Sequence, residues 1–226
     1  MNKKKVTAII LAAGNSVRYG QNRNKNLEVV NNQTILEYSL KEFNNNKKID
    51  NIIITAKESD LDEINKIIYK NRSTKPIKTV IGGKTRQESV YNSINSTDSN
   101  IVIIHDAARP MIKQEYIDEC IVELDNFIGV TIGVKSKDTI KIASSDGIIE
   151  TTTNRANTWI IQTPQCFDRL SLLDAHNKFK NDSDITDDCM ILERNNEKVK
   201  IISGDYSNIK LTTFDDLNLV NGFLKK

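Results

Sequence analysis

The sequence has few of the residues that build disulfide-linked or metal-bound domains. It contains three cysteines and two histidines among 226 residues. Cys120, Cys166 and Cys189 lie far apart, without metal-ligand spacing and without the even number of a disulfide framework. Two of them stand among apolar residues at helix-like spacing, so we expect buried thiols that take no part in chemistry.

The chain also lacks a long apolar run and an excess of charge of one sign. No stretch is long enough to span a bilayer. The apolar segment that follows the basic residues 1–5 is too short for a signal peptide and runs into Gly14. Lys plus Arg number 32 and Asp plus Glu 30, and this net charge of +2 provides no basic field for nucleic acid. We therefore expect a cytoplasmic protein with no membrane or nucleic-acid partner, whose anion sites are built locally.

What the sequence does contain is a series of short apolar runs separated by helical patterns. Thr34 and Glu37 form a capping box ahead of one such pattern, and others begin at 59–62 and cover 117–124. Strands that alternate with helices predict a mostly parallel sheet covered on both faces, that is, an α/β fold of the Rossmann-like three-layer type. The length suits a single domain, 1–226. The apolar runs that predict strands are residues 6–11, 52–55, 77–81, 101–104 and 128–134.

The pattern changes after residue 134. Residues 139–143 and 148–152 predict two short strands, joined by the turn residues 144–147. The hairpin arm, at about 137–155, has too little core of its own, so we expect it to pack on a second subunit. Two later runs, 199–202 and 209–212, also predict strands, and 213–216 opens a terminal helix.

Ligands of open parallel sheets bind beyond the carboxyl ends of the strands, so polar residues there are the first candidates. The loop after the first strand carries Gly14, Arg18 and, further on, Lys25. Small residues let backbone N–H groups approach a phosphate chain, and the two cations suit its charge. The loop is neither a dinucleotide glycine pattern nor a Walker loop. Taken alone, it is better described as a polar loop with two solvated cations.

Two further loops follow predicted strands. Asp106 emerges from the run 101–104, where a carboxylate can hold Mg²⁺ at a phosphate site. It could equally cap the following turn or pair with Arg109, and His105 beside it is interpreted as a packed residue. Gly82 and Gly83 suit close approach to a base or ribose, although without context a tight turn into a helix is the simpler interpretation.

Together these segments resemble the 2-C-methyl-D-erythritol 4-phosphate cytidylyltransferase family over essentially the whole chain. The most specific pair is His-Asp-Ala-Ala-Arg-Pro with Gly-Gly-x-x-Arg-x-x-Ser. The resemblance rests on Ala12-Ala13-Gly14, Arg18, Lys25, Gly82-Gly83, Arg86, Ser89, residues 105–110, Thr163-Pro164-Gln165 and Asn208-Ile209-Lys210. The chain departs from many members at Ser16, where they have glycine, and at Asn24 and Asn26, where they have proline and glutamine.

The resemblance implies a fold, an activity and a nucleotide site. The implied enzyme joins CTP to 2-C-methyl-D-erythritol 4-phosphate and releases pyrophosphate, a step in isoprenoid precursor synthesis. Arg18 and Lys25 would stabilise charge on the α-phosphate of CTP, and Asp106 would hold Mg²⁺ or another divalent cation. The cytidine nucleotide would be held by Ala12, Ala13, Gly14, Gly83 and Ser89.

The resemblance also implies a second anion site and a homodimer. Arg155 and Lys210 would grip the phosphate of the polyol substrate, with Asp106, Arg109 and Thr163 beside it. Thr139, on the arm, would reach the active site of the other subunit.

These residue types suit the reaction. A phosphate monoester is already an anion at neutral pH and needs no general base, so catalysis should consist of positioning and cationic stabilisation of an in-line displacement. The motifs accordingly contain Arg, Lys and a metal-binding Asp, and no catalytic Ser, Cys or His is expected.

Three alternatives remain at this stage. The nearest is ribitol-5-phosphate cytidylyltransferase, which makes CDP-ribitol; its members usually carry Ala-Val where this chain has Ala107-Ala108. A non-catalytic nucleotide-binding module is favoured only by the altered loop at Ser16 and Asn24. A sugar-1-phosphate nucleotidyltransferase that uses UTP or TTP is disfavoured by the Gly-Gly-x-x-Arg-x-x-Ser motif.

Overall fold

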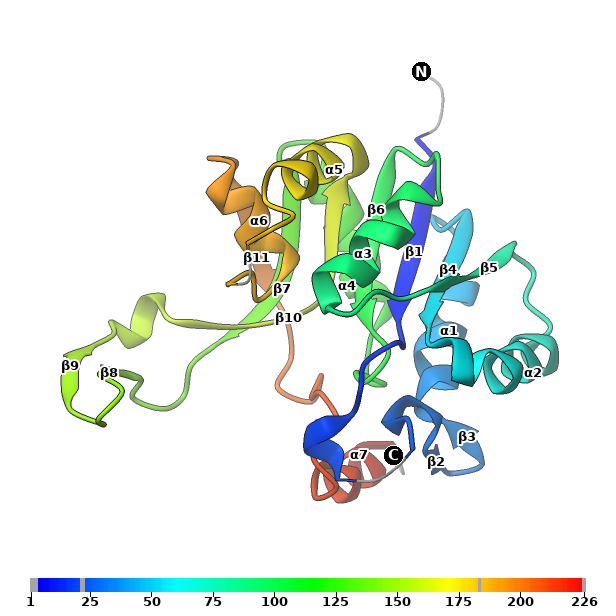
Figure 1. Cartoon of the computed structure of the whole chain (residues 1–226), viewed down its shortest axis with the longest axis horizontal. Coiled ribbons are helices and arrows are strands. Elements are labelled where there is room, and N and C mark those ends of the chain that lie inside the picture. The colour runs from blue at the N-terminus through cyan, green and yellow to red at the C-terminus, as the bar shows by residue number, and fades with distance from the viewer. Residues whose placement is uncertain (1–3, 21–22, 183, 225–226) are drawn as a thin grey trace.

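The computed structural model describes residues 4–20, 23–182 and 184–224, and its centre is one seven-stranded sheet (Figure 1). The strand order is β11-β7-β10-β6-β1-β4-β5. All neighbouring strands are parallel except β10, which runs antiparallel to both β6 and β7. The expected α/β fold with a mostly parallel sheet is confirmed. The strands are β1 (Val6–Leu11), β4 (Asn51–Ala56), β5 (Ile77–Ile81), β6 (Ile101–Asp106), β7 (Gly129–Lys135), β10 (Trp159–Asp168) and β11 (Val199–Ser203).

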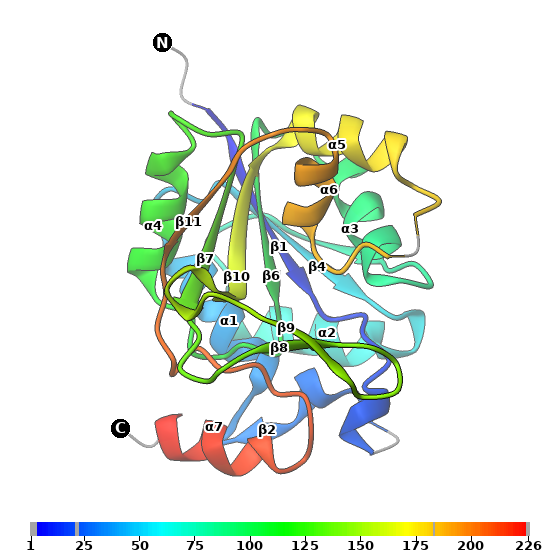
Figure 2. The same ribbon diagram turned by 90° about the vertical axis from the view of Figure 1, so that its left-hand side faces the viewer.

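Helices cover both faces of the sheet, as Figure 2 shows. One apolar cluster joins the sheet to α1, α2 and α4, and contains Phe43, Ile64 and Ile117. The other joins it to α3, α5 and α6, and contains Ile94, Leu172 and Leu192. Central strands are therefore buried on both sides, which is why they appear in the sequence as continuous apolar runs. The helices are α1 (Ile35–Asn45), α2 (Leu61–Asn71), α3 (Arg86–Asn95), α4 (Gln114–Glu123), α5 (Arg169–Lys178) and α6 (Asp188–Arg194).

Several elements were not expected from the sequence. Helices α5 and α6 and strand β10 fall in segments without clear apolar periodicity, whereas α3 agrees with the simpler interpretation of Gly82 and Gly83 as a tight turn into a helix. Strand β10 contains Pro164, which cannot donate to a sheet ladder, and its pairing with β7 shifts register between Ile161 and Gln165. The shift places a polar stretch of β10 beside the carboxyl end of β6, where it contributes to the site described below.

The segment after β1 is irregular and leads into α1 through short elements. These are the 3₁₀ turns η1 (Val17–Tyr19) and η2 (Lys25–Leu27) and the two-stranded ribbon β2 (Val29–Val30) and β3 (Gln33–Thr34). The capping box at the start of α1 is confirmed: Glu37 N donates to Thr34 Oγ1, and Thr34 N donates to the Glu37 carboxylate.

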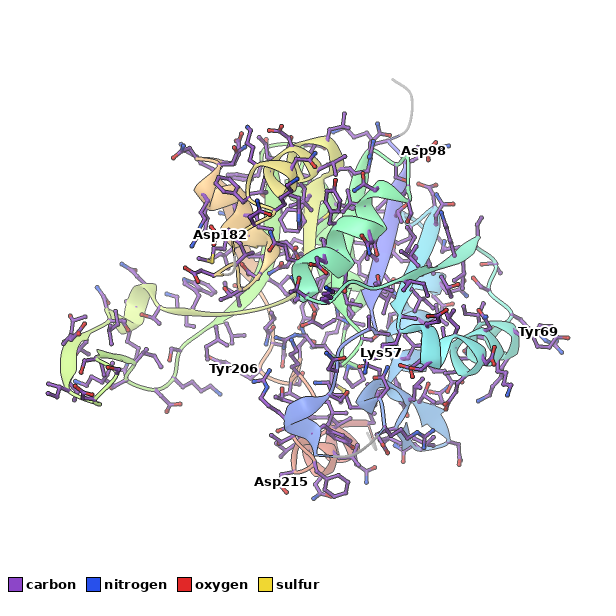
Figure 3. The ribbon with its side chains drawn as sticks, viewed as in Figure 1. Lys57, Tyr69, Asp98, Asp182, Tyr206 and Asp215 are labelled. Atoms are coloured by element: carbon purple, nitrogen blue, oxygen red, sulfur yellow. The ribbon has the colours of Figure 1, made fainter. Side chains whose placement is uncertain are left out.

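The inserted arm is the most exposed part of the chain. Strands β8 (Lys141–Ala143) and β9 (Ile149–Thr152) pair antiparallel, and Gly147 takes a left-handed conformation in the turn between them. Figure 1 shows the arm extending away from the sheet, and both of its strands are exposed along their length. At its base, Tyr206 donates a hydrogen bond to the carbonyl of Lys135 and lies under the ammonium of Lys137 (Figure 3).

The prediction of a strand at 209–212 is wrong. The alternation of apolar and polar residues there does not extend the sheet. Instead, Leu211 N donates to the carbonyl of Ala108. The Leu211 side chain packs in a separate apolar cluster with Tyr19 of η1 and with Val220 of the terminal helix α7 (Asp216–Leu224). The alternation thus reflects burial against a helix and a loop.

Two expectations about composition can be compared with the structure. Cys120, Cys166 and Cys189 are free and buried, as expected. Burial raises the pKa of all three thiols above the usual range of cysteine. The reactive thiolate form of each cysteine is therefore disfavoured. Among the described helices, none has the length and apolar character needed to cross a membrane.

The capping box yields a test of the fold. Thr34→Ala should lower the free energy of unfolding by about 1 kcal/mol, because an orphan helix N–H loses its acceptor in a buried position. Urea denaturation measures the change, with Thr74→Ala, an exposed threonine before β5, as control. Equal stabilities of the two variants would contradict the assigned role of the cap.

Candidate functional site

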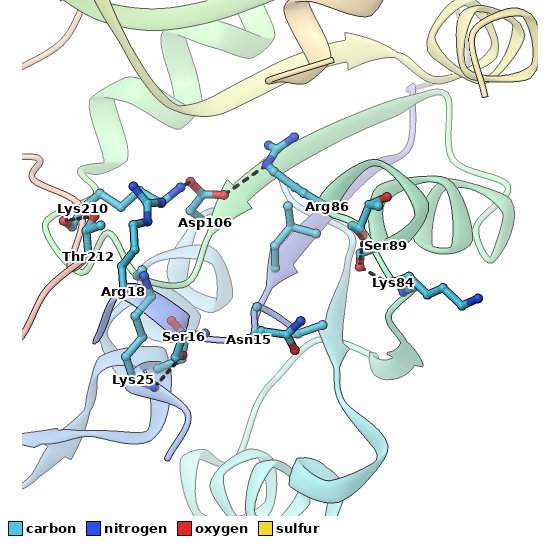
Figure 4. Close-up of a pocket in the computed structure, with 17 residues that line it drawn as sticks. Asn15, Ser16, Arg18, Lys25, Lys84, Arg86, Ser89, Asp106, Lys210 and Thr212 are labelled. Atoms are coloured by element: carbon cyan, nitrogen blue, oxygen red, sulfur yellow. Dashed lines mark hydrogen bonds and ion pairs between the residues drawn. The ribbon is translucent and has the colours of Figure 1, made fainter. Parts of the chain in front are cut away.

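A cleft of about 360 Å³ opens at the carboxyl edge of the sheet, where β1, β5 and β6 end. Its lining is dominated by glycine, small polar residues and cations, with one carboxylate. Figure 4 shows the side chains of Arg18 and Lys25 extending from the loop after β1 toward Lys210 and Asp106. The residues that line it include Ala13, Gly14, Asn15, Ser16, Arg18, Lys25, Gly83, Lys84, Thr85, Arg86, Ser89, Asp106, Lys210 and Thr212.

The loop after β1 is shaped by residues that depart from the usual family pattern. Ser16 has a φ of 52°, in the left-handed region that glycine adopts without strain, and its hydroxyl accepts a hydrogen bond from Lys25 N. The side-chain amides of Asn24 and Asn26 both donate to the carbonyl of Ala12. Asn24 also caps η2 by accepting from Asn26 N. Ser16 and the two asparagines therefore fix the loop that presents Lys25.

Ala12 supports the loop and does not contact the cleft. Its side chain is fully buried, its N–H donates to the carbonyl of Thr55, and its carbonyl is used by the two asparagines. Of the three residues predicted to hold the nucleotide at this loop, Ala13 and Gly14 line the cleft and Ala12 does not.

The glycine pair after β5 permits a close approach between loops. A Cβ at Gly82 would lie 2.5 Å from the Cβ of Ala13, and one at Gly83 would lie 2.2 Å from the Cβ of Glu88. Gly83 N donates to Ser89 Oγ, which in turn donates to the carbonyl of Thr85. Gly82 thus lets the loop after β5 lie against Ala13 of the loop after β1, and Gly83 lets it lie against α3. Residues of both loops line the cleft.

Asp106 is the centre of charge in the cleft. Its Oδ2 lies 2.6 Å from Lys210 Nζ, and its Oδ1 lies 3.6 Å from Arg86 Nε. Burial opposes ionisation of Asp106, but Arg86 and Lys210 outweigh it and hold the pKa of the carboxyl well below its usual range. Asp106 is therefore an anion at neutral pH.

A chain of hydrogen bonds fixes the backbone at Asp106. Asp106 N donates to Thr163 Oγ1, and Thr163 Oγ1 lies 3.0 Å from His105 Nδ1. His105 Nε2 lies 3.1 Å from the carbonyl of Arg109, which can only accept. Nε2 therefore carries the proton of the neutral ring, and Thr163 donates to Nδ1. Burial lowers the pKa of His105 to about 4, consistent with a packed, uncharged residue.

The same region positions Lys210. Asn208, fully buried, donates its side-chain amide to the carbonyl of Thr163 and accepts at its own carbonyl from the guanidinium of Arg109. Leu211 N donates to the carbonyl of Ala108. Lys210 thus lies between two anchors that tie its segment to β6 and β10. Arg109 and Thr163 line a hollow that adjoins the cleft on the far side of Asp106, where a second ligand could reach Lys210.

The surroundings of Lys25 disfavour its protonated form. Partial burial, together with Lys210 and Arg18, lowers its pKa to about 8. Crowding of like charges costs free energy in the free protein, and that cost is relieved when an anion binds. The site is therefore suited to a ligand that carries several negative charges.

Arg86 was quoted in the sequence motif but was given no role. The structure places its guanidinium between two carboxylates, with NH1 2.8 Å from Asp188 Oδ2 and Nε near Asp106. The Gly-Gly-x-x-Arg spacing puts it at the first position of α3, and that spacing was the signal that could have identified it. Asp188 lies in a segment without any pattern, and nothing in the sequence indicated it.

Arg155 and Thr139 do not join the other predicted residues within this chain. Arg155 begins the 3₁₀ turn η4 (Arg155–Asn157), and both residues are exposed in the arm. Neither lines the cleft or the adjoining hollow. Within one subunit, Arg155 therefore does not share a site with Lys210. That Arg155 grips the polyol phosphate and that Thr139 reaches the cleft of another subunit stay predictions.

The residues present fit a metal ion that is shared with a bound phosphate, and no metal cage made by the protein. Among the described residues there is no group of three or more His, Cys, Asp or Glu side chains that could hold a metal ion. Asp106 is the carboxylate that the cleft offers. Mg²⁺ commonly binds through one or two carboxylates, with phosphate oxygens and waters completing its shell.

Comparison with known proteins agrees with this geometry. The family model described as 2-C-methyl-D-erythritol 4-phosphate cytidylyltransferase matches residues 6–226. Proteins of that name from Clostridium acetobutylicum and Clostridium perfringens are 42% and 41% identical to the chain. The matches cover 97% of the chain and 97% of the first protein, and 98% of the chain and 99% of the second.

The fold matches solved structures as well. The crystal structure of 4-diphosphocytidyl-2C-methyl-D-erythritol synthase from Anaerococcus prevotii has a TM-score of 0.89 and 33% sequence identity, over 100% of both chains. From the fold, the cleft and these matches, the chain belongs to the 2-C-methyl-D-erythritol 4-phosphate cytidylyltransferase family.

Proposed function

We propose that this protein transfers the cytidylyl group of CTP to 2-C-methyl-D-erythritol 4-phosphate and releases pyrophosphate. The observation that carries the proposal is the meeting of Arg18, Lys25 and Lys210 around Asp106 in one cleft. Three cations around one carboxylate leave an excess of positive charge, which can offset the repulsion between two phosphate groups as they approach each other. The family to which the chain belongs performs this reaction by name.

The reaction is a displacement at phosphorus. A phosphate oxygen of the polyol phosphate attacks the α-phosphorus of CTP, and the bond from that phosphorus to the bridging oxygen of pyrophosphate breaks. Negative charge grows on the oxygens around the α-phosphorus and on the leaving group. Arg18 and Lys25 are placed to stabilise that charge, and Lys210 is placed to orient the attacking phosphate. No proton has to be removed from the nucleophile.

We assign the triphosphate to the wall made by Ala13, Gly14 and the loop after β5, because that wall is lined by small residues and Lys25. The polyol phosphate is assigned to the adjoining hollow, which contains Arg109 and Thr163. Asp106 separates the two and faces both. When bound there, Mg²⁺ would neutralise phosphate charge and polarise phosphate oxygens, with Asp106 as its protein ligand.

A homodimer joined through the arm is the proposed assembly. The arm carries four exposed isoleucines, Ile140, Ile142, Ile148 and Ile149, with exposed fractions of 40–68%. Exposed apolar side chains grouped on a projecting hairpin support burial against a second subunit. Such a partner would also bring Arg155 and Thr139 to a cleft. A cytoplasmic location and the absence of a nucleic-acid partner stay predictions from the sequence.

The site offers no support for the three alternative functions considered from the sequence. A non-catalytic module was favoured by the unusual loop alone, and Ser16, Asn24 and Asn26 build that loop through hydrogen bonds of their own. Nothing in the site favours ribitol 5-phosphate or a UTP- or TTP-dependent reaction. Pyrophosphate release measured with four nucleotides and both polyol phosphates distinguishes them; turnover of UTP, or of ribitol 5-phosphate in preference, would overturn the proposal.

Two substitutions separate the roles of the cations. Lys25→Ala should lower kcat by about two to three orders of magnitude with little change in the KM for CTP, because the contact strengthens as charge develops. Lys210→Ala should instead raise the KM for the polyol phosphate. Steady-state kinetics with each substrate varied measures both, and equal small effects would count against the assignments.

The low pKa of Lys25 predicts a pH dependence. The protonated form stabilises phosphate, so kcat/KM for CTP should fall as the pH rises through about 8, the pKa of Lys25 in the free protein. Lys25→Arg keeps its charge at that pH, so its profile should stay flat there, although its absolute rate can be lower. A wild-type profile that stays level through this range, or an Arg variant with the same fall, contradicts the assignment.

Subunit complementation tests the shared site. Lys25→Ala and Arg155→Ala should each be nearly inactive alone. After mixing and exchange of subunits, half of the dimers pair the two variants, and one of their two sites is then intact. About a quarter of wild-type activity should return in an equal mixture of symmetric dimers. If Arg155 acts within its own subunit, or if the protein is a monomer, mixing restores nothing.

A further inference from the structure

A row of alternating charges runs from the cleft into the protein interior. It begins at Lys210 and continues through Asp106 and Arg86 to Asp188, with distances of 2.6, 3.6 and 2.8 Å between successive groups. Beyond it, His176 Nε2 lies 3.5 Å from Asp188 Oδ1. Asp188 and His176 do not line the cleft, and the proposed reaction makes no use of either.

Asp188 is unusual because its charged carboxylate has almost no contact with solvent. Its side chain and that of His176 are each 1% exposed. Its Oδ2 lies 2.8 Å from Arg86 NH1, whereas His176 Nε2 lies farther away, 3.5 Å from Oδ1. Arg86 is thus the main compensation for the buried charge. Burial opposes ionisation of Asp188, but Arg86 outweighs it and lowers the pKa of the carboxyl.

The backbone supports this placement. Asp188 is the first residue of α6, where the helix dipole favours a negative charge, and Asp187 caps the helix by accepting from Met190 N. Arg86 is the first residue of α3, whose N-cap is Thr85. The opposed charges therefore lie on the starts of two helices that pack on the same face of the sheet.

The Arg86 guanidinium lies near two carboxylates, and it is closer to Asp188, the more deeply buried of the two. The contact to Asp188 is 2.8 Å, whereas the contact to Asp106 Oδ1 is 3.6 Å. A guanidinium without Asp188 would be free to close on Asp106 in the two-bond arrangement that arginine forms with carboxylates. Since Lys210 already holds Oδ2, such a move would leave neither oxygen of Asp106 available.

We propose that Asp188 is a positioning residue that holds the Arg86 guanidinium back from Asp106 and so leaves Asp106 Oδ1 open to a divalent cation. The inference rests on the proposed function, because it concerns metal-dependent binding of CTP in the same cleft. His176 closes the far side of Asp188 and completes the buried wall against which Arg86 is held.

The test is Asp188→Asn, which removes the charge and keeps the shape. Calorimetric titration of CTP at a series of MgCl₂ concentrations should show the Mg²⁺ requirement for half-maximal affinity rising by about 10- to 100-fold, the usual range for a residue that supports a metal ligand. Because the competition is for one oxygen, saturating Mg²⁺ should restore most of the affinity and of kcat. A damaged fold would not be repaired by Mg²⁺ in this way.

Asp168→Asn is the matched control. Asp168 is the carboxylate that caps α5 by accepting from Ser171 N, and it lies outside the charge row. Because asparagine caps a helix about as well as aspartate, this variant should change neither Tm appreciably nor the Mg²⁺ requirement. An equal rise in that requirement for both variants, or no rise for Asp188→Asn, overturns the inference.

A double-mutant cycle shows whether Asp188 acts through Arg86. In an Arg86→Gln background, adding Asp188→Asn should not change the Mg²⁺ requirement further, and should raise Tm because it removes a buried charge left without its partner. This comparison remains available if Asp188→Asn alone proves too unstable to study. An added loss of CTP affinity in the double variant contradicts the inference. Absence of wild-type turnover with normal CTP binding would instead reject the proposed function.

Discussion

The ionised carboxylate of Asp106 is the interaction on which the cleft depends. Five cations, Arg18, Lys25, Lys84, Arg86 and Lys210, line the same cleft, and Asp106 is the one carboxylate among its lining residues. Without it, like-charge repulsion among side chains at the ends of β1, β5 and β6 would be uncompensated. With it, the cleft keeps an excess of positive charge that only a bound anion can balance. Burial lowers the pKa of Lys25, and repulsion by Lys210 and Arg18 adds to the effect of burial. Repulsion among the cations of the cleft lowers the stability of the free protein and favours anion binding, as is common at functional sites.

The position of Asp106 is in turn fixed by uncharged groups. Thr163, His105 and the carbonyl of Arg109 form a continuous hydrogen-bonded chain in which each donor has one acceptor. Asn208 links that chain to the segment that carries Lys210. A neutral histidine is essential to this arrangement, because a charged ring would have to donate from both nitrogens and would compete with Thr163 for the role of donor. The burial that lowers the pKa of His105 therefore also preserves the geometry of its neighbour.

The sequence predicted the parts of the fold that depend on burial on both faces of the sheet. The runs at 6–11 and 101–104 fall in β1 and β6, because a strand buried between two layers of helices appears as a nearly continuous apolar run. It failed at β10, where Pro164 and polar residues interrupt the pattern because the strand bends to form part of the site. It failed at 209–212 for the opposite reason: alternation there comes from packing against α7. The charged residues of the cleft were recognised through motifs, whereas Asp188, which lies outside every motif, required the three-dimensional arrangement.

The ion pair between Lys210 and Asp106 has a consequence for how two substrates share the cleft. In the free protein, Lys210 is already partly removed from water by a carboxylate partner, so binding a phosphate exchanges one anionic partner for another. Asp106 would keep Arg86 and Arg109 as cationic neighbours in that exchange, and a divalent cation at its Oδ1 would offset the loss of the ammonium from Oδ2. Under the proposed function, each substrate would therefore make the binding of the other less costly. A divalent cation at Asp106 would weaken the hold of that carboxylate on Lys210, and Lys210 would then be available to the polyol phosphate. Coupling of this kind is reciprocal by thermodynamic necessity. It needs no movement of the backbone, because the exchange takes place between side chains whose main-chain positions are held by Thr163 and Asn208.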